Sequence, residues 1–240
     1  MYYPYYYGFD WTYLVLVLPC MLLSLWASSN VNSTFKKYSK QFSSRRLTGA
    51  EAAQRVLSAN GVRGVRIDRV SGNLTDHFDP KTNVIRLSDS VYSSTSTAAI
   101  GVACHEAGHA VPYAENYGPI KLRAAIIPIT NFGSKIAMPL ILLGILCTFL
   151  GSFSDTLVYM GIAAFGMSFV FQIVTLPVEF NASRRAMQAI ESANILTEEE
   201  QRGARKTLTA AAMTYVAATA VALAQLLRLI MIFGGRRRND

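Results

Sequence analysis

Residues 98–111 read AAIGVACHEAGHAV, a run of small and apolar residues that carries two histidines and one glutamate. No proline and no other charge interrupts it, which predicts a buried helix within a longer one from Ser93 to Glu115. Positions four apart share one helix face, so His105 and His109 can present ring nitrogens to a single ion. Glu106, next to the first histidine, can reach a metal-bound water without ligating the metal. The stretch therefore predicts a zinc site of the hydrolase type, with Glu106 as general base. Histidines that merely fill the core are the alternative, which is disfavoured because the chain has only three.

Four apolar segments surround this helix in the sequence, at residues 11–27, 136–150, 157–178 and 209–233. The chain of 240 residues is 51% hydrophobic and only 16% charged. Residues 151–155 are a short loop that predicts an antiparallel hairpin of the second and third segments. Arg228 interrupts the fourth, alanine-rich segment, so whether it spans fully is left open. The expected fold class is a mainly α polytopic membrane protein with about four transmembrane helices.

The first apolar segment is expected to be an uncleaved anchor. The first basic residue is Lys36, so the basic start of a signal peptide is missing, and the tyrosines among residues 2–7 suit a membrane interface. The three cysteines, Cys20, Cys104 and Cys147, are scattered in apolar settings, which predicts no disulfide framework. Cys104 precedes a presumed ligand but is expected to be a small buried residue.

Positive charge predicts the orientation in a bacterial inner membrane. Fourteen of the 23 Lys and Arg residues lie between Lys36 and Lys135, and five between Arg184 and Lys206, which would be the cytoplasmic side. The basic tail Arg236–Arg238 does not fit this orientation, because four full crossings from an outside N-terminus would place it outside. The net charge is +8, and the basic residues that produce it border the apolar segments and form no stripe with interleaved aromatic residues. Lipid headgroups are therefore the expected partners of this charge, and nucleic acid is not.

The region after the first segment is expected to form a small soluble fold. Thr48 and Glu51 have the spacing of a capping box and predict a helix that ends near Asn60-Gly61. Residues 65–70 and 84–87 alternate apolar and polar side chains and predict a small antiparallel β-hairpin, with turn residues at 79–83. Asp76 and His77 precede this turn and either line the cleft or form an Asx-type turn before Pro80.

A catalytic zinc site needs a third protein ligand. Glu179 directly follows the third apolar segment, and the hairpin would return it to the face where His105 lies. An ion pair of Glu179 with Arg184 or Arg185 is the alternative, and His77 is another candidate ligand. The expected organisation is an N-terminal tail with the first span (1–30), a cytoplasmic zincin-like region with the metal-binding helix (31–135), a transmembrane hairpin (136–178), a cytoplasmic segment with the third metal ligand (179–208), and a fourth transmembrane or membrane-packed helix with a basic tail (209–240).

Two motifs, His105-Glu106-Ala107-Gly108-His109 and Glu179-Phe180-Asn181-Ala182-Ser183, resemble those of membrane gluzincin peptidases of the HtpX and CaaX-prenyl-protease type. In those peptidases the second motif is Glu-x-x-Ala-Asp, and its glutamate is the third zinc ligand. Ser183 stands in place of the aspartate. The stretches at residues 36–40, 47–53, 74–80, 85–88 and 176–186 resemble the YugP-like neutral zinc metallopeptidases of bacteria, whose pattern shares this serine. The resemblance implies Zn²⁺ held by His105, His109 and Glu179, with Glu106 as catalytic base.

The expected function is zinc-dependent hydrolysis of peptide bonds at the cytoplasmic membrane face, in membrane-protein processing or quality control. Candidates for stabilising the oxyanion are Arg184, Arg185, Tyr113 and His77, and residues 84–87 could bind an extended substrate by strand addition. Peptides or membrane proteins are the expected substrates, and a homo-oligomer or a quality-control partner is left open. A catalytically silent zinc-binding scaffold or adaptor is the alternative, and a transporter or channel is a weaker one because the apolar segments lack paired acidic residues.

Overall fold

The computed structural model describes residues 11–115 and 118–234 of the chain. The tyrosines before residue 11 and the arginines at 236–238, on which part of the membrane argument rests, lie outside these residues. The elements in chain order are η1 (Tyr13–Val17), α1 (Leu18–Tyr38), α2 (Gly49–Ala59), β1 (Arg66–Val70), β2 (His77–Asp79), β3 (Val84–Ser88), α3 (Thr97–Ala114), α4 (Gly118–Leu146), η2 (Thr148–Leu150), α5 (Ser152–Ser192) and α6 (Glu198–Phe233).

Within residues 11–115 and 118–234, four helical stretches are long and apolar enough to cross a membrane: Tyr13–Tyr38, Gly118–Leu146, Ser152–Ser192 and Glu198–Phe233. The mainly α, polytopic fold class is therefore confirmed. Each stretch extends beyond the apolar segment that predicted it, because helical turns with polar residues continue the apolar runs. The largest extension at a single helix end is that of α4, which begins at Gly118 although its predicted apolar segment begins only at Ile136.

Two compact units divide the described residues. The first, called here the site unit, comprises Ala27–Ile127 and Ile173–Val216. The second, called here the span unit, comprises the described parts of Met1–Trp26, Pro128–Gln172 and Ala217–Asp240. The long helices contribute to both units, and each unit has a buried cluster of its own.

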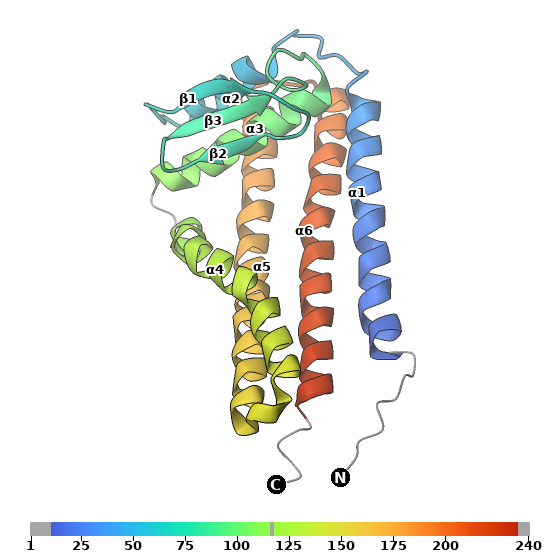
Figure 1. Cartoon of the computed structure of the whole chain (residues 1–240). Coiled ribbons are helices and arrows are strands. Elements are labelled where there is room, and N and C mark those ends of the chain that lie inside the picture. The colour runs from blue at the N-terminus through green and yellow to red at the C-terminus, as the bar shows by residue number, and fades with distance from the viewer. Residues whose placement is uncertain (1–10, 116–117, 235–240) are drawn as a thin grey trace. The chain divides into compact units, whose positions relative to one another are not determined.

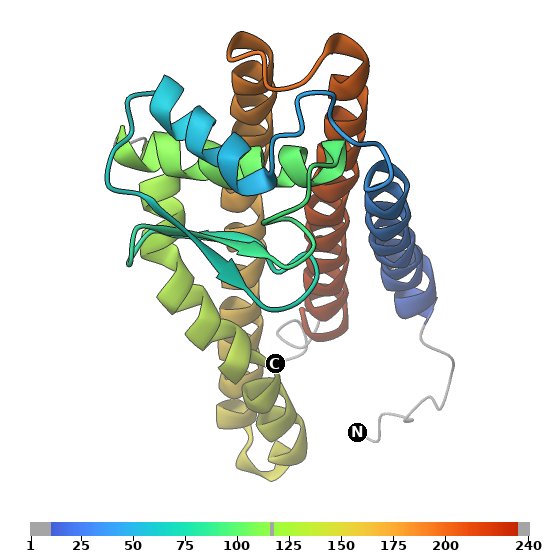
Figure 2. The ribbon, with the colours of Figure 1, turned by 90° about the horizontal axis from the view of Figure 1, so that it is seen from above.

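The core of the site unit is formed by α3 and the elements around it. Ala99, Ile100 and Ala103 of α3 are fully buried, and the small side chains of the two alanines let neighbouring helices approach closely. Figures 1 and 2 show α2 next to α3 and the three strands beside one another. Leu57 of α2 and Leu87 of β3 are buried in the same cluster. Burial of each of these two leucines stabilises the packing around α3 by about 1.5–3 kcal/mol.

The start of α2 is fixed as the sequence predicted. The Thr48 side chain accepts the backbone N–H of Glu51, and the Glu51 carboxylate accepts the backbone N–H of Thr48. This capping box pairs two backbone donors that would otherwise lack partners, a contribution of about 1 kcal/mol.

The sheet has three strands in the order β1-β3-β2. β1 and β3 run parallel, with Arg66 opposite Val84, and β2 pairs antiparallel with β3. The predicted antiparallel pairing of residues 65–70 with 84–87 is therefore wrong. The alternation of apolar and polar residues determines which side chains share a face of the sheet. It is the same whether neighbouring strands run parallel or antiparallel, so it does not predict the strand direction. The turn at residues 80–83 instead joins β3 to β2, the short strand that the sequence analysis missed.

The span unit is built on close helix contacts. Gly144 of α4 lies against Ser154 and Val158 of α5, and a Cβ added to it would come within 2.7 Å of the Ser154 carbonyl oxygen. The Ser154 hydroxyl donates to the carbonyl of Gly144 at 2.7 Å. Small residues and hydrogen bonds between helices are typical of membrane helix packing. Arg228, which interrupts the fourth apolar segment, lies over the ring of Tyr13 with 5.5 Å between guanidinium carbon and ring centroid.

Candidate metal centre

Helix α3 places both histidines on one face. The Ser96 side chain accepts the N–H of Ala99 and caps the helix, which begins at Thr97 and not at Ser93. The Nε2 atoms of His105 and His109 lie 3.2 Å apart, and the ring planes meet at 84°. The predicted i, i+4 pair is therefore formed, with the two Nε2 atoms directed at a common point.

Glu179 of α5 completes a triangle with these nitrogens. Its Oε2 lies 3.3 Å from the Nε2 of His105 and 3.3 Å from the Nε2 of His109. Two ligand atoms of a tetrahedral zinc ion, bonded at about 2.0–2.1 Å, lie about 3.3 Å apart. The three edges of the triangle fit this spacing, so these residues are placed to hold one zinc ion. The side chain of Glu179 is almost completely buried, which a carboxylate tolerates only with charged partners.

The contact between α3 and α5 depends on Gly108. A Cβ at this position would lie 2.5 Å from the carbonyl oxygen of Ala182 on α5. Real Cβ atoms do not approach so closely, so glycine is needed here for packing and not for a special backbone angle. The absent side chain lets the histidines come within ligand distance of Glu179.

Two further residues orient the ligands. The hydroxyl of Ser183 lies 3.1 Å from Nδ1 of His105, on the ring side opposite the metal-facing nitrogen. A hydrogen bond there fixes the ring and the tautomer, in which Nδ1 carries the proton. Ser183, which stands in place of the aspartate of the related motif, thus contacts a ligand histidine. Arg123 of α4 forms an ion pair with the other carboxylate oxygen of Glu179, with Nη1 2.9 Å from Oε1.

The charge around His105 favours a cation. Burial opposes a charged imidazole, but the hydrogen bond to Glu179 and the negative charges of Glu106 and Glu179 outweigh it, so the pKa of His105 lies above its usual value. The same negative surroundings favour a divalent ion at this point.

Glu106 lies at the cavity that borders the triangle. It is buried, and its cavity of about 170 Å³ is lined by residues of α3, α4, α5 and α6 and by β2 with its flanking residues. A carboxylate in this place can accept a proton from a group bound in the cavity. The lining residues are Asp76, His77, Phe78, Pro80, Glu106, His109, Tyr113, Ile120, Arg123, Ala124, Ile127, Glu179 and Tyr215.

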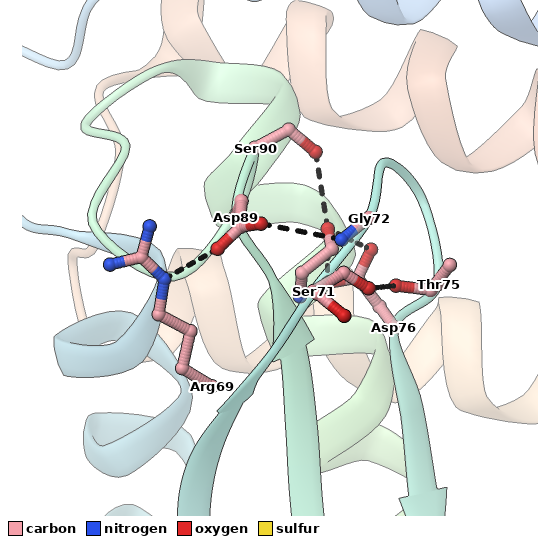
Figure 3. Close-up of polar contacts among 8 residues, drawn as sticks. Arg69, Ser71, Gly72, Thr75, Asp76, Asp89 and Ser90 are labelled. Atoms are coloured by element: carbon pink, nitrogen blue, oxygen red, sulfur yellow. Dashed lines mark hydrogen bonds and ion pairs between the residues drawn. The ribbon is translucent and has the colours of Figure 1, made fainter.

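Asp76 reaches this cavity because its loop is fixed by hydrogen bonds (Figure 3). The Asp76 carboxylate accepts the N–H and the hydroxyl of Ser88, and the carboxylate of Asp89 accepts the N–H of Gly72 and pairs with Arg69 at 2.6 Å. Burial raises the pKa of Asp76 above its usual value, against the effect of the Ser88 hydrogen bonds. Of the two roles predicted for Asp76, lining the cleft or forming an Asx-type turn before Pro80, the structure therefore shows the first. The Asx-type turn is formed instead by Asp79, whose carboxylate accepts the N–H of Lys81.

The other sequence candidates divide by position. His77 and Tyr113 line the cavity, but His77 is not part of the ligand triangle and its Nδ1 lies 2.9 Å from the carbonyl of Thr75. Arg184 donates to Asn181, and Arg185 pairs with Glu115, so the ion pair of Glu179 is made by neither. The ion-pair alternative therefore named the wrong arginines. Cys104 is fully buried, as expected, and burial raises the pKa of its thiol.

Arg123 and Tyr215 were missed in the sequence. Arg123 lies 56 positions before its partner Glu179, and Tyr215 lies in an alanine-rich apolar run, so no sequence motif marks either residue. The available signal was weak: Lys121 and Arg123 are charges in the otherwise apolar stretch 119–129.

Comparison with known proteins agrees with this geometry. The sequence profile of the family described as "Putative neutral zinc metallopeptidase" matches residues 13–234. The chain belongs to this family. It is also 47% identical over 228 residues to the "Putative membrane protease YugP" of Bacillus subtilis (strain 168), covering 95% of this chain and 99% of that protein. No solved structure matches this chain. Membership of this zinc peptidase family confirms the resemblance inferred from the motifs and, with the ligand triangle, zinc as the cofactor.

Proposed function

We propose that this membrane protein hydrolyses peptide bonds with a zinc ion held by His105, His109 and Glu179, as a gluzincin does. The observation that carries the proposal is the triangle of ligand atoms with 3.2–3.3 Å edges beside a cavity that contains the buried Glu106. When bound, zinc would polarise a water molecule and the scissile carbonyl. The name of the Bacillus relative, a membrane protease, supports the same function.

Glu106 is the general base in this proposal. Its carboxylate takes the proton of the attacking water and afterwards delivers it to the amine of the leaving peptide. Besides the ligand His109 and Arg123, which pairs with Glu179, three side chains with donor groups line the cavity and can face the developing negative oxygen: His77, Tyr113 and Tyr215.

The substrate would enter along β2. Strand addition at residues 84–87 is excluded, because β3 is the central strand and both of its edges are already paired. β2 lies at an edge of the sheet, and its His77 and Phe78 line the cavity. An extended peptide backbone that pairs with β2 would therefore pass the metal centre.

We place the site at the cytoplasmic face, acting on membrane-protein or peptide substrates. The site unit carries 18 of the 23 Lys and Arg residues, which supports this side by the positive-inside rule. Processing or quality control of membrane proteins is the role that fits a peptidase of this kind.

Glu106→Gln tests the base. We expect the purified full-length variant to keep one zinc ion per chain and to lose hydrolysis of unfolded casein by at least about 100-fold. Glu115→Gln, a change of the same kind at the end of α3, is the matched control and should leave hydrolysis near that of the wild type. Casein hydrolysis that survives in Glu106→Gln would contradict the base, and a wild-type chain that binds zinc without hydrolysis would favour the scaffold alternative.

A further inference from the structure

The two carboxylate oxygens of Glu179 lie in different surroundings. Oε2 faces the two histidine nitrogens at 3.3 Å, whereas Oε1 lies 2.9 Å from Nη1 of Arg123. Arg123 is on the second turn of α4, and Ile120, Ala124 and Ile127 of the same helix line the cavity beside it. The first turns of α4 therefore bring a positive charge to the side of Glu179 that faces away from the ligand triangle.

We propose that Arg123 is a positioning residue that restricts Glu179 to binding zinc through one oxygen. The inference rests on the proposed metal centre. A carboxylate can bind a metal ion through one oxygen or through both. The ion pair with Arg123 competes with the second mode, because the guanidinium charge 2.9 Å from Oε1 attracts that oxygen and so opposes its approach to the metal.

This restriction matters because a catalytic zinc site needs an open position. Three protein ligands leave the fourth tetrahedral position for water. Were Glu179 to bind through both oxygens, four protein atoms would surround the ion, and water would have to enter as a fifth ligand. Arg123 would thus preserve the coordination that hydrolysis requires, without touching the substrate.

The ion pair of Arg123 and Glu179 is largely buried, which supports a positioning role for Arg123 and distinguishes the pair from one at the protein surface. The side chain of Glu179 is 3% exposed and that of Arg123 is 26% exposed, so water screens their attraction only partly. Lys121, two positions earlier on α4, is exposed and does not line the cavity. Its charge is nevertheless the same, which makes it a matched control.

The test uses the full-length chain in detergent micelles, loaded with Co²⁺ in place of zinc. The visible absorption of Co²⁺ is intense in four-coordinate tetrahedral sites and weaker when a fifth ligand binds. For Arg123→Gln and Arg123→Met we expect one metal ion per chain but an absorption reduced by roughly twofold or more, together with loss of casein hydrolysis. Because a single nitrogen makes the contact, Arg123→Lys should restore the wild-type spectrum, and Lys121→Gln should leave it unchanged.

A wild-type spectrum in the two neutral variants would overturn the inference. So would failure of both neutral variants to fold or to hold metal, because Arg123 would then support the structure and not the coordination mode. If instead the wild-type chain binds no Co²⁺ and no zinc, the metal centre itself is contradicted. The metal readouts thereby separate failure of this inference from failure of the proposed peptidase activity.

Discussion

Replacing Gly108 by alanine should separate the histidines from Glu179. The added Cβ would lie 2.5 Å from the carbonyl oxygen of Ala182, whereas ordinary contacts begin at 3.4 Å. Helices α3 and α5 must therefore move apart by about 0.9 Å, the difference between these two distances. Such a shift is nearly half the length of a zinc–nitrogen bond of about 2.0–2.1 Å, so one ion can no longer reach all three ligands with good geometry.

We expect Gly108→Ala to weaken zinc binding by about 10–100-fold, the range found when the support of a metal ligand is lost. Overpacking should in addition reduce the free energy of unfolding by about 1–3 kcal/mol. Competition for zinc with a chromophoric chelator measures the first quantity, and thermal unfolding of the purified protein measures the second.

Gly101→Ala is the matched control for this experiment. It makes the same substitution on the same helix, but its Cβ would lie 3.1 Å from Ala204 on α6, so the neighbour needs to give by only a few tenths of an ångström. This variant should bind zinc nearly as the wild type does. Wild-type zinc affinity in Gly108→Ala would refute the reasoning that a close approach of α3 and α5 sets the ligand distances.

Three further predictions follow from other contacts. Ser183→Ala removes the partner of His105 Nδ1 and should lower zinc affinity about tenfold, as measured by the same chelator competition, while Ser183→Thr, which keeps a hydroxyl, should retain more of it. Hydrogen bonds from Thr82, Arg86 and Lys81 hold the pKa of Asp79 well below its usual value. The contribution of these hydrogen bonds to the free energy of unfolding is therefore present above a pH of about 4 and is lost as the pH falls further. The difference in melting temperature between the wild type and Asp79→Asn should accordingly narrow between pH 6 and pH 3, and a constant difference would contradict this assignment. Removal of zinc with EDTA should lower the melting temperature of the wild type but not that of a chain with His105→Ala and His109→Ala, because binding to the folded state alone stabilises it.

Elements with a local cause were predictable from the sequence. The capping box at Thr48 depends on residues three positions apart, and the pair His105 and His109 depends on one helical turn. Four apolar helices followed from the length of the apolar runs. Glu179 was found by combining a buried charge with the return of a hairpin, and its predicted proximity to the histidines is confirmed by the distances.

Elements that depend on distant partners were not predictable in the same way. The alternation in residues 65–70 carries no information about strand direction, so the parallel pairing of β1 with β3 was missed. β2 has only three residues, too few to show a period. Arg123 acquires its meaning only when α4 brings it to Glu179, and the two glycines of α3 acquire theirs only from the backbones of α5 and α6.

The most direct test of the central claim is the zinc content of the purified full-length chain and of two variants, Glu179→Gln and His77→Ala. With the ligand set His105, His109 and Glu179, we expect about one zinc ion per chain in the wild type and in His77→Ala, and a large loss in Glu179→Gln. Full zinc content in Glu179→Gln together with loss in His77→Ala would move the third ligand to β2 and contradict the metal centre described here.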